Sequence, residues 1–318
     1  MTTSRYALVR ALAMIPTLLG AGTAVFVLIR LVPGTVVEQI LGTQGNVTEA
    51  QRAALRAFFG LDQPILVQYG RWLTKVLTGD LGHSWVNGKP VSELLLARLP
   101  VTLELTVLGM AVALVLGLPL GMLSAIHRGS KLDAAARILS LLGLSVPEIW
   151  QATMMILLFS LAFHWMPPTT FVSPFRNPTG NLLAMIWPAI TLGTVFGANI
   201  ARLTRSSTLE QLRFDYVRTA RAKGLAERVV LLRHVLKNAL IPILTLSGLG
   251  VGYLLGGAVI VEEVFTLPGM GRLLLTAIYQ RDYPLVQGAI LFIAFAFALA
   301  NMCIDILYAY VDPRIRDR

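Results

Sequence analysis

The side chains that most often perform catalysis or bind metal ions are scarce in this 318-residue chain. The four histidines are dispersed along the sequence, at His83, His127, His164 and His234, and the single cysteine is Cys303. Many zinc sites and hydrolase triads are marked by short sequence motifs, and neither H-E-x-x-H nor G-x-S-x-G occurs here. The phosphate-binding motif G-x-x-x-x-G-K-S/T is also absent. We therefore expect no metal site, no cofactor and no ATP-binding site in this chain, and we do not expect an enzyme.

Polar side chains inside apolar sequence are stronger candidates for function. Glu148 follows a proline in S-V-P-E-I-W, Glu262 and Glu263 end an apolar run, and Asn199 lies within another. An ionisable side chain at membrane depth is costly and commonly lines a solute or ion pathway. We predict that these four residues line a solute pathway or its gate. For Glu148, the alternative is that it lies where water penetrates into the membrane. An intramembrane aspartyl protease is not indicated, because Asp305 has no second aspartate within the apolar runs.

A basic segment from Arg202 to Lys237 contrasts with the rest of the chain, which is 55% hydrophobic and only 14% charged. The segment holds nine Lys or Arg residues against three acids. A stripe at helical spacing, formed by Leu209, Leu212, Tyr216 and Ala220, predicts an amphipathic helix. We expect Gly224 to end that helix and a second helical stretch to follow from Glu227. Such a segment can lie on anionic lipid or dock on a cytoplasmic protein, and the mixture of acids and Thr219 with the cations favours docking.

The elements that must position these residues are helices that cross a membrane. Runs without Lys, Arg, Asp or Glu occupy Ala11–Ile29, Leu105–Ile126, Leu182–Ala201, Ala239–Val261 and Leu285–Ile304, and Glu148 alone interrupts a sixth run, Ile138–Phe163. Each run reaches or approaches the ~20 residues that a helix needs to cross ~30 Å of hydrocarbon. The runs are continuous, whereas the strands of a transmembrane barrel alternate. The sequence predicts an all-α polytopic membrane protein with about six transmembrane helices.

Basic residues in short loops predict how the chain is oriented. With the N-terminus inside, the inner segments carry 17 Lys or Arg residues and the two short outer loops carry three. We expect both termini in the cytoplasm of a bacterial cell, with the chain in the inner or plasma membrane. This bias and anionic lipid account for the net charge of +10, so no nucleic-acid partner is expected.

The sequence divides into three predicted parts. The first is the N-terminus with the first helix (1–32), and the second is an extracytoplasmic helical insertion (33–100), in which Thr48 and Gln51 form a capping box. The third is a five-helix core (101–318) with a cytoplasmic loop at 202–238.

Several motifs, in the order of one known family, run through almost the whole chain. They are F-F-G-L-D-Q-P-I-L-V-Q-Y-G-R-W-L and Gly79–Trp85 in the insertion, Arg98–Thr106 and Gly117–Gly121 around the second span, Y-V-R-T-A-R-A-K-G-L in the basic segment, and Val261–Leu274, Arg281–Gly288 and Val311–Arg316 near the C-terminus. With these motifs the chain resembles the permeases of ATP-binding-cassette (ABC) importers, in particular the dipeptide permease B-like type of the dipeptide/oligopeptide/nickel family. Ala220 and Gly224 match the core of that family's cytoplasmic docking loop, often called the EAA loop. Arg218 and Thr219 stand in place of its leading glutamate, as is usual in the peptide branch.

The resemblance implies the type I permease fold and ATP-driven alternating access. It implies a second homologous permease, two ATPase subunits that bind ATP and Mg²⁺, an extracytoplasmic solute-binding protein and membrane lipid as partners. The residues implied to couple the chain to an ATPase are Asp215, Tyr216, Val217, Arg218, Thr219, Ala220, Arg221, Ala222, Lys223 and Gly224. Di- or oligopeptides are the implied solutes, with nickel complexes, glutathione and sugars as alternatives. A stand-alone channel or secondary transporter is the alternative of a different class, and it leaves the docking loop without a role.

Overall fold

The computed structural model describes residues 3–32, 34, 37–38, 48–168 and 170–311 of the chain. Over these ranges the protein is helical, and its β-structure is limited to an isolated bridge between His83 and Pro90. The chain divides into two compact units, one made of Met1–Pro100 with Arg272–Arg318 and the other of Val101–Gly271. Residues 272–318, predicted as part of the core, thus group with the N-terminal third.

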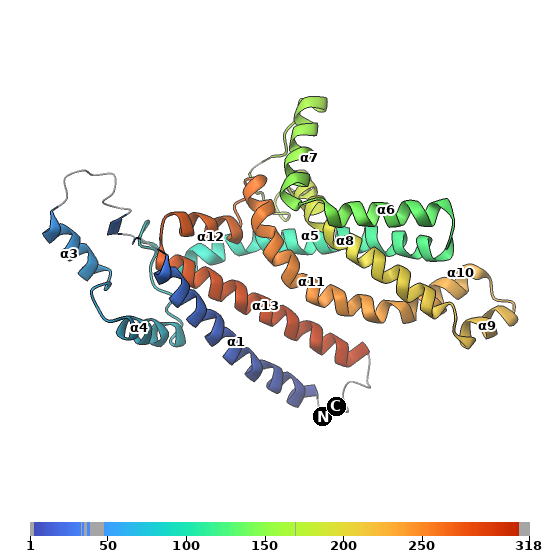
Figure 1. Cartoon of the computed structure of the whole chain (residues 1–318), viewed down its shortest axis with the longest axis horizontal. Coiled ribbons are helices and arrows are strands. Elements are labelled where there is room, and N and C mark those ends of the chain that lie inside the picture. The colour runs from blue at the N-terminus through green and yellow to red at the C-terminus, as the bar shows by residue number, and fades with distance from the viewer. Residues whose placement is uncertain (1–2, 33, 35–36, 39–47, 169, 312–318) are drawn as a thin grey trace. The chain divides into compact units, whose positions relative to one another are not determined.

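The first unit pairs helices from the two ends of the chain. Its helices are α1 (Thr3–Leu31), α3 (Glu49–Phe58), α4 (Ile65–Leu77) and α13 (Tyr283–Val311), while α5 (Val91–Ile126) and α12 (Met270–Tyr279) span the boundary between the units. Helix α1 packs along α13 (Figure 1), and Phe26 of α1 is buried against the rings of Tyr69 and Trp72. The predicted capping box is confirmed: Gln51 N–H donates to Thr48 Oγ1 (3.3 Å) and Thr48 N–H donates to Gln51 Oε1 (3.0 Å).

Two of the motifs meet in the first unit although they are far apart in sequence. Asp282, immediately before α13, is completely buried. Its carboxylate accepts hydrogen bonds from the Ser84 hydroxyl and from the Trp85 N–H, the latter at 3.0 Å. A buried carboxylate is tolerated only when its oxygens are satisfied in this way. The contact therefore fixes the loop after α4 to the start of α13.

The second unit is built around α8. Its helices are residues 101–126 of α5, α6 (Lys131–Ser145), α7 (Glu148–Phe163), α8 (Pro178–Gln211) and α11 (Leu236–Val264). Helix α8 packs against α11, α6 and α7, and its Leu192 and Ile200 are fully buried. Gly117 of α5 faces the α8 backbone so closely that a Cβ there would lie 2.6 Å from the Gly197 carbonyl oxygen. Small residues four apart, Gly117 and Gly121, allow this close helix packing, which membrane helices commonly use.

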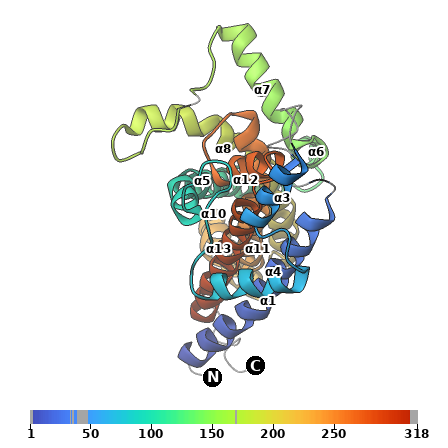
Figure 2. The same ribbon diagram turned by 90° about the vertical axis from the view of Figure 1, so that its left-hand side faces the viewer.

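The sixth apolar run, Ile138–Phe163, is not one continuous helix. It is divided between α6 and α7, which are bent by 102° at a short break. In both views α7 turns sharply away from α6 (Figures 1 and 2). Val146 is extended (φ −87°, ψ 122°) because the following Pro147 disfavours the helical conformation in the residue before it. The described residues contain five helices long and apolar enough to cross a membrane, or six if the bent pair forms one span.

Candidate functional site

The basic segment folds into a helical hairpin, which we call the α9 hairpin and define as Asp215–Val235. It consists of α9 (Asp215–Ala222), a turn, the short α10 (Glu227–Val229) and a π-helical segment, η1 (Val230–Val235), that leads into α11. Figure 1 shows α9 and α10 beyond the end of α8. The single amphipathic helix predicted across Leu209–Ala220 is wrong, because α8 ends at Gln211 and α9 begins only at Asp215. The backbone at Phe214 is extended (φ −72°, ψ 148°), which ends one helix and starts the next.

An apolar core holds the two arms of the hairpin together. Val217 and Ala220 of α9 pack with Val230 and Val235 of η1, and the three valines have no exposed surface. Burying a valine side chain stabilises a fold by roughly 1.5–3 kcal/mol. The half-buried Tyr216 joins this core and donates a hydrogen bond from its hydroxyl to Gln211 Oε1 (2.7 Å), across the break before α9. The hairpin is therefore a packed structure and not a loose loop.

The turn between the arms depends on Gly224, as the sequence predicts. Gly224 has φ +74°, a conformation that costs a residue with a side chain energy but is open to glycine. Its N–H donates to the Arg221 carbonyl (2.9 Å), and the Leu225 N–H reaches the Ala220 carbonyl (3.4 Å). No atom lies within 4 Å of the place where a Cβ at Gly224 would be. The requirement for glycine is thus one of backbone conformation and not of space.

A bidentate ion pair between Arg221 and Glu227 closes the turn. The Arg221 guanidinium donates to both oxygens of Glu227, at 2.6 and 3.1 Å. The hydrogen bonds to Glu227 raise the pKa of Arg221 above its ordinary value. Arg221 is therefore engaged within the hairpin, although the sequence placed it among the residues that couple to a partner.

The outer face of α9 is polar and free of packing. The side chains of Asp215 and Arg218 are 94% and 80% exposed, and their ion pair is long, at 3.6 Å. Sorted by position, the predicted coupling residues on the surface are Asp215, Arg218, Thr219, Ala222, Lys223 and Gly224, whereas Tyr216, Val217 and Ala220 face the hairpin core. A small rigid helix with one packed face and one charged face can make hydrogen bonds and ion pairs to another protein without refolding.

Among the predicted pathway residues, Glu148 has a partner that the sequence did not reveal. The Tyr253 hydroxyl of α11 donates to Glu148 Oε1 at the start of α7 (2.9 Å). Tyr253 also stacks on Phe196 of α8, with ring centroids 5.9 Å apart. A Cβ on Gly257, one turn further along α11, would lie 3.0 Å from Glu148 Oε2. The bend before α7 thus places the Glu148 carboxylate against α11, where it accepts a hydrogen bond from Tyr253 and lies beside Gly257.

Glu262 and Glu263 are neighbours in sequence but have different environments. Glu262 is completely buried: it accepts from the Thr102 hydroxyl (2.5 Å), which in turn accepts from the Met270 N–H (2.8 Å). Gly269 leaves the space for this carboxylate, because a Cβ there would overlap it. Glu263 is exposed. Asn199, on α8, is partly buried, and its amide reaches the Val195 carbonyl at 3.5 Å. The hydrogen bonds described for Glu262 and Asn199 do not involve Glu148.

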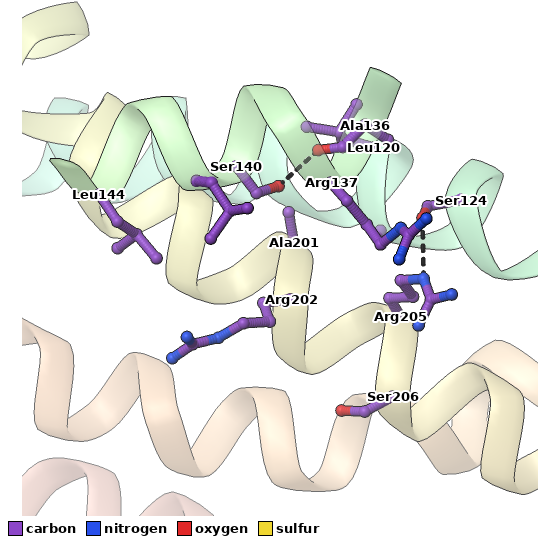
Figure 3. Close-up of a pocket in the computed structure, with 12 residues that line it drawn as sticks. Leu120, Ser124, Ala136, Arg137, Ser140, Leu144, Ala201, Arg202, Arg205 and Ser206 are labelled. Atoms are coloured by element: carbon purple, nitrogen blue, oxygen red, sulfur yellow. Dashed lines mark hydrogen bonds between the residues drawn. The ribbon is translucent and has the colours of Figure 1, made fainter. Parts of the chain in front are cut away.

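An ion pair with a buried carboxylate, which sequence reasoning missed, joins α5, α6 and α8. The Arg205 guanidinium donates to both oxygens of Asp133 (2.9 and 3.0 Å), and the Ser124 hydroxyl donates to Asp133 Oδ1 (2.6 Å). The Gly129 N–H also donates to Asp133, at 3.0 Å. The cluster borders a pocket shown in Figure 3. The one local hint in the sequence is Ser130, three residues before Asp133, which caps the start of α6.

Comparisons with known proteins place this architecture in a family. The family described as binding-protein-dependent transport system inner membrane component matches residues 117–317, and the N-terminal membrane component of the same systems matches residues 3–106. The dipeptide transport system permease protein DppB of Alkalihalophilus pseudofirmus is 40% identical over 331 residues, covering 98% of this chain and 99% of that protein. The glutathione transport system permease protein GsiC of Salmonella paratyphi A is 40% identical over 312 residues, covering 98% of each chain.

Solved structures agree on the fold. An inward-facing structure of the MetNI methionine ABC transporter has a TM-score of 0.55 at 19% identity and covers 69% of this chain and 96% of that chain. A crystal structure of an amino acid ABC transporter with histidines has a TM-score of 0.51 at 16% identity, covering 70% and 94%. Helical spans, near-complete family matches and relatives of 40% identity lead to one conclusion. The chain belongs to the binding-protein-dependent transport system inner membrane components, and it is a membrane-spanning permease subunit of an ABC importer.

Proposed function

We propose that this permease moves di- or oligopeptides into the cell and that the α9 hairpin couples it to a cytoplasmic ATPase. The observation that carries the coupling is the exposed charged face of α9, held on a core of fully buried valines. Movement of an ATPase can be transmitted to α11 only through a rigid contact, and η1 connects the hairpin directly to that helix. Asp215, Arg218, Thr219, Ala222 and Lys223 make the contact, while Val217, Ala220, Arg221 and Gly224 keep its shape.

The proposed assembly has this chain beside a second homologous permease, with two ATPase subunits that bind Mg²⁺ and ATP below and an extracytoplasmic solute-binding protein above. Both termini face the cytoplasm, which the excess of basic residues in the inner segments supports. Glu148, with Tyr253, is our first choice for a residue on the solute pathway. Glu263 and Asn199 are further pathway candidates, and Glu262 holds the turn after α11 at the outer gate.

Peptides are the proposed solute class because relatives of 40% identity are named for a dipeptide and for glutathione, itself a small peptide. Nickel complexes and sugars remain alternatives. A channel or secondary transporter is the alternative of another class, and it predicts transport that needs no ATPase.

The test is uptake of labelled dipeptide into vesicles that contain the four core subunits and the solute-binding protein. We expect uptake only with ATP, competition by unlabelled dipeptides or glutathione, and none by nickel or sugars. Omitting the ATPases while keeping both permeases separates the classes: uptake that persists without them identifies a channel or secondary transporter. ATP-dependent uptake of another solute alone would retain the importer and reject the peptide.

A further inference from the structure

A small pocket between α5, α6 and α8 has no role in the coupling described above. Its volume is about 260 Å³. Its lining includes Ser124, Arg137, Leu141, Leu144, Arg202 and Arg205. Figure 3 shows Arg137 and Arg205 at the Ser124 end, whereas Arg202 extends toward Leu144. Three guanidinium groups thus border a cavity whose other walls are mostly aliphatic.

The positive charge of this pocket is only partly compensated. Asp133 accepts both hydrogen bonds of Arg205 and lies 3.6 Å from Arg137. No described residue forms an ion pair with Arg202. Three guanidinium groups are therefore balanced by a single carboxylate, that of Asp133. The pocket carries an excess of positive charge that an anion would neutralise.

The arginines lie at the edge of the hydrocarbon. Arg137 immediately precedes the apolar run Ile138–Phe163, and Arg202 immediately follows the run Leu182–Ala201. A charge at that level normally reaches toward the lipid headgroups or meets a counter-charge. Basic pockets between membrane helices at this level are the kind that bind acidic phospholipid headgroups.

The outer side of α6 indicates that lipid, and not water, adjoins the pocket. Leu132, Ile138, Leu139 and Leu142 are each more than half exposed in this chain. Leu141, which lines the pocket, is 58% exposed as well. An acyl chain can therefore lie along these leucines.

We infer that this pocket binds an anionic phospholipid, whose phosphate meets Arg202 and whose acyl chain lies along the exposed leucines of α6. The pocket is smaller than the ~300–1,000 Å³ typical of sites that enclose a small molecule, so it suits a headgroup better than a whole peptide. This lipid site does not depend on which solute the importer carries.

The experiment uses the purified four-subunit importer in phosphatidylcholine vesicles that contain a photoactivatable phosphatidylglycerol. Labelling of α6 and α8 is mapped by mass spectrometry. We expect Arg202→Gln to lower this labelling about fivefold, since one basic residue near an anionic surface contributes ~1 kcal/mol. Arg213→Gln removes the same charge from an exposed position outside the pocket and should leave the labelling unchanged. Arg202→Lys should restore most of it.

Three outcomes overturn the inference. Equal losses in Arg202→Gln and Arg213→Gln mean general attraction of lipid to a basic surface. Displacement of the label by millimolar inorganic phosphate means that the ligand is a free anion. Crosslinks from α6 to the second permease in place of lipid mean that a protein covers the pocket. Dipeptide uptake is measured separately, so a failed lipid site and a wrong solute are distinguished.

Discussion

Reversing the charge of Arg221 should weaken the coupling between solute and ATP hydrolysis. Reversing the charge of its partner Glu227 as well should restore that coupling. We expect Arg221→Glu to place a carboxylate against Glu227 at the turn of the α9 hairpin. The double variant Arg221→Glu, Glu227→Arg re-creates the pair in the opposite sense. If Arg221 acts within the hairpin, the double variant recovers; if Arg221 touches the ATPase, it does not.

The size of the effect follows from exposure. The side chains of Arg221 and Glu227 are 44% and 53% exposed, and pairs of this kind contribute ~0.2–1 kcal/mol. Repulsion between like charges costs ~0.2–0.5 kcal/mol, so the reversal costs about 0.4–1.5 kcal/mol in all. The three fully buried valines contribute roughly 1.5–3 kcal/mol each. The hairpin therefore stays folded, and we expect coupling to fall about two- to twelvefold rather than to vanish.

The assay is solute-stimulated ATP hydrolysis by the purified four-subunit importer, with co-purification of the subunits as the control for assembly. Arg218→Glu serves as the comparison, because Arg218 is 80% exposed and lies on the outer face. A like charge across an interface costs several kcal/mol, so this change should lower stimulated hydrolysis at least tenfold. Failure of the charge-swapped pair to recover would refute the internal role of Arg221. Normal hydrolysis in Arg218→Glu would refute docking through this face.

Three further predictions concern the turn, the pathway and the orientation. Gly224→Val should strain the turn by ~1–2 kcal/mol and lower stimulated hydrolysis, because φ is +74°, whereas Gly224→Asn should be tolerated; equal activities would contradict the argument. Glu148→Gln should leave the amount of protein in the membrane unchanged and alter dipeptide uptake, and unchanged uptake at every pH would make the acid structural. In a Cys303→Ser background, an impermeant maleimide should label Gln63→Cys but not Ala222→Cys in intact cells, and the reverse pattern would invert the orientation.

The apolar runs predict where most spans lie, because hydropathy is a property of neighbouring residues. The same signal conceals the break at Val146 and Pro147, since the residues on both sides are equally apolar. Pro147 is visible in the sequence, but a proline also occurs inside continuous helices here, as Pro188 does in α8. Whether a proline bends a helix or divides it is decided by tertiary packing.

The hairpin illustrates the boundary between local and tertiary information. The inward-facing Ala220 is predicted from helical spacing, and Gly224 is predicted because glycine commonly ends a helix. The pair of Arg221 with Glu227 crosses a turn at a spacing of six, which no helical rule reveals. The partners Asp133 and Arg205 are 72 residues apart, so only the fold brings them together.

Neighbouring glutamates show the same limit on a smaller scale. Glu262 and Glu263 were predicted together because both end one apolar run. Successive residues on a helix point about 100° apart, so one is completely buried against Thr102 and the other is exposed. Composition identified the pair of acids, but their separate environments depend on what packs against each side of α11.

The π-helical segment η1 determines the direction in which α9 presents its charged face. Hydrogen bonds from residue i to i+5 accommodate one residue more than the i to i+4 bonds of an α-helix. If Val230–Val235 kept α-helical bonding, the chain before it would be turned about α11 by about 100° per residue of changed register. Two permeases with the same α9 sequence, one with a π-helical and one with an α-helical segment before α11, would then present the arginines of α9 in different directions around α11. The hydrogen-bond register of these six residues therefore sets the direction in which α9 presents its charged face and, under the proposed coupling, the side from which an ATPase would meet this subunit.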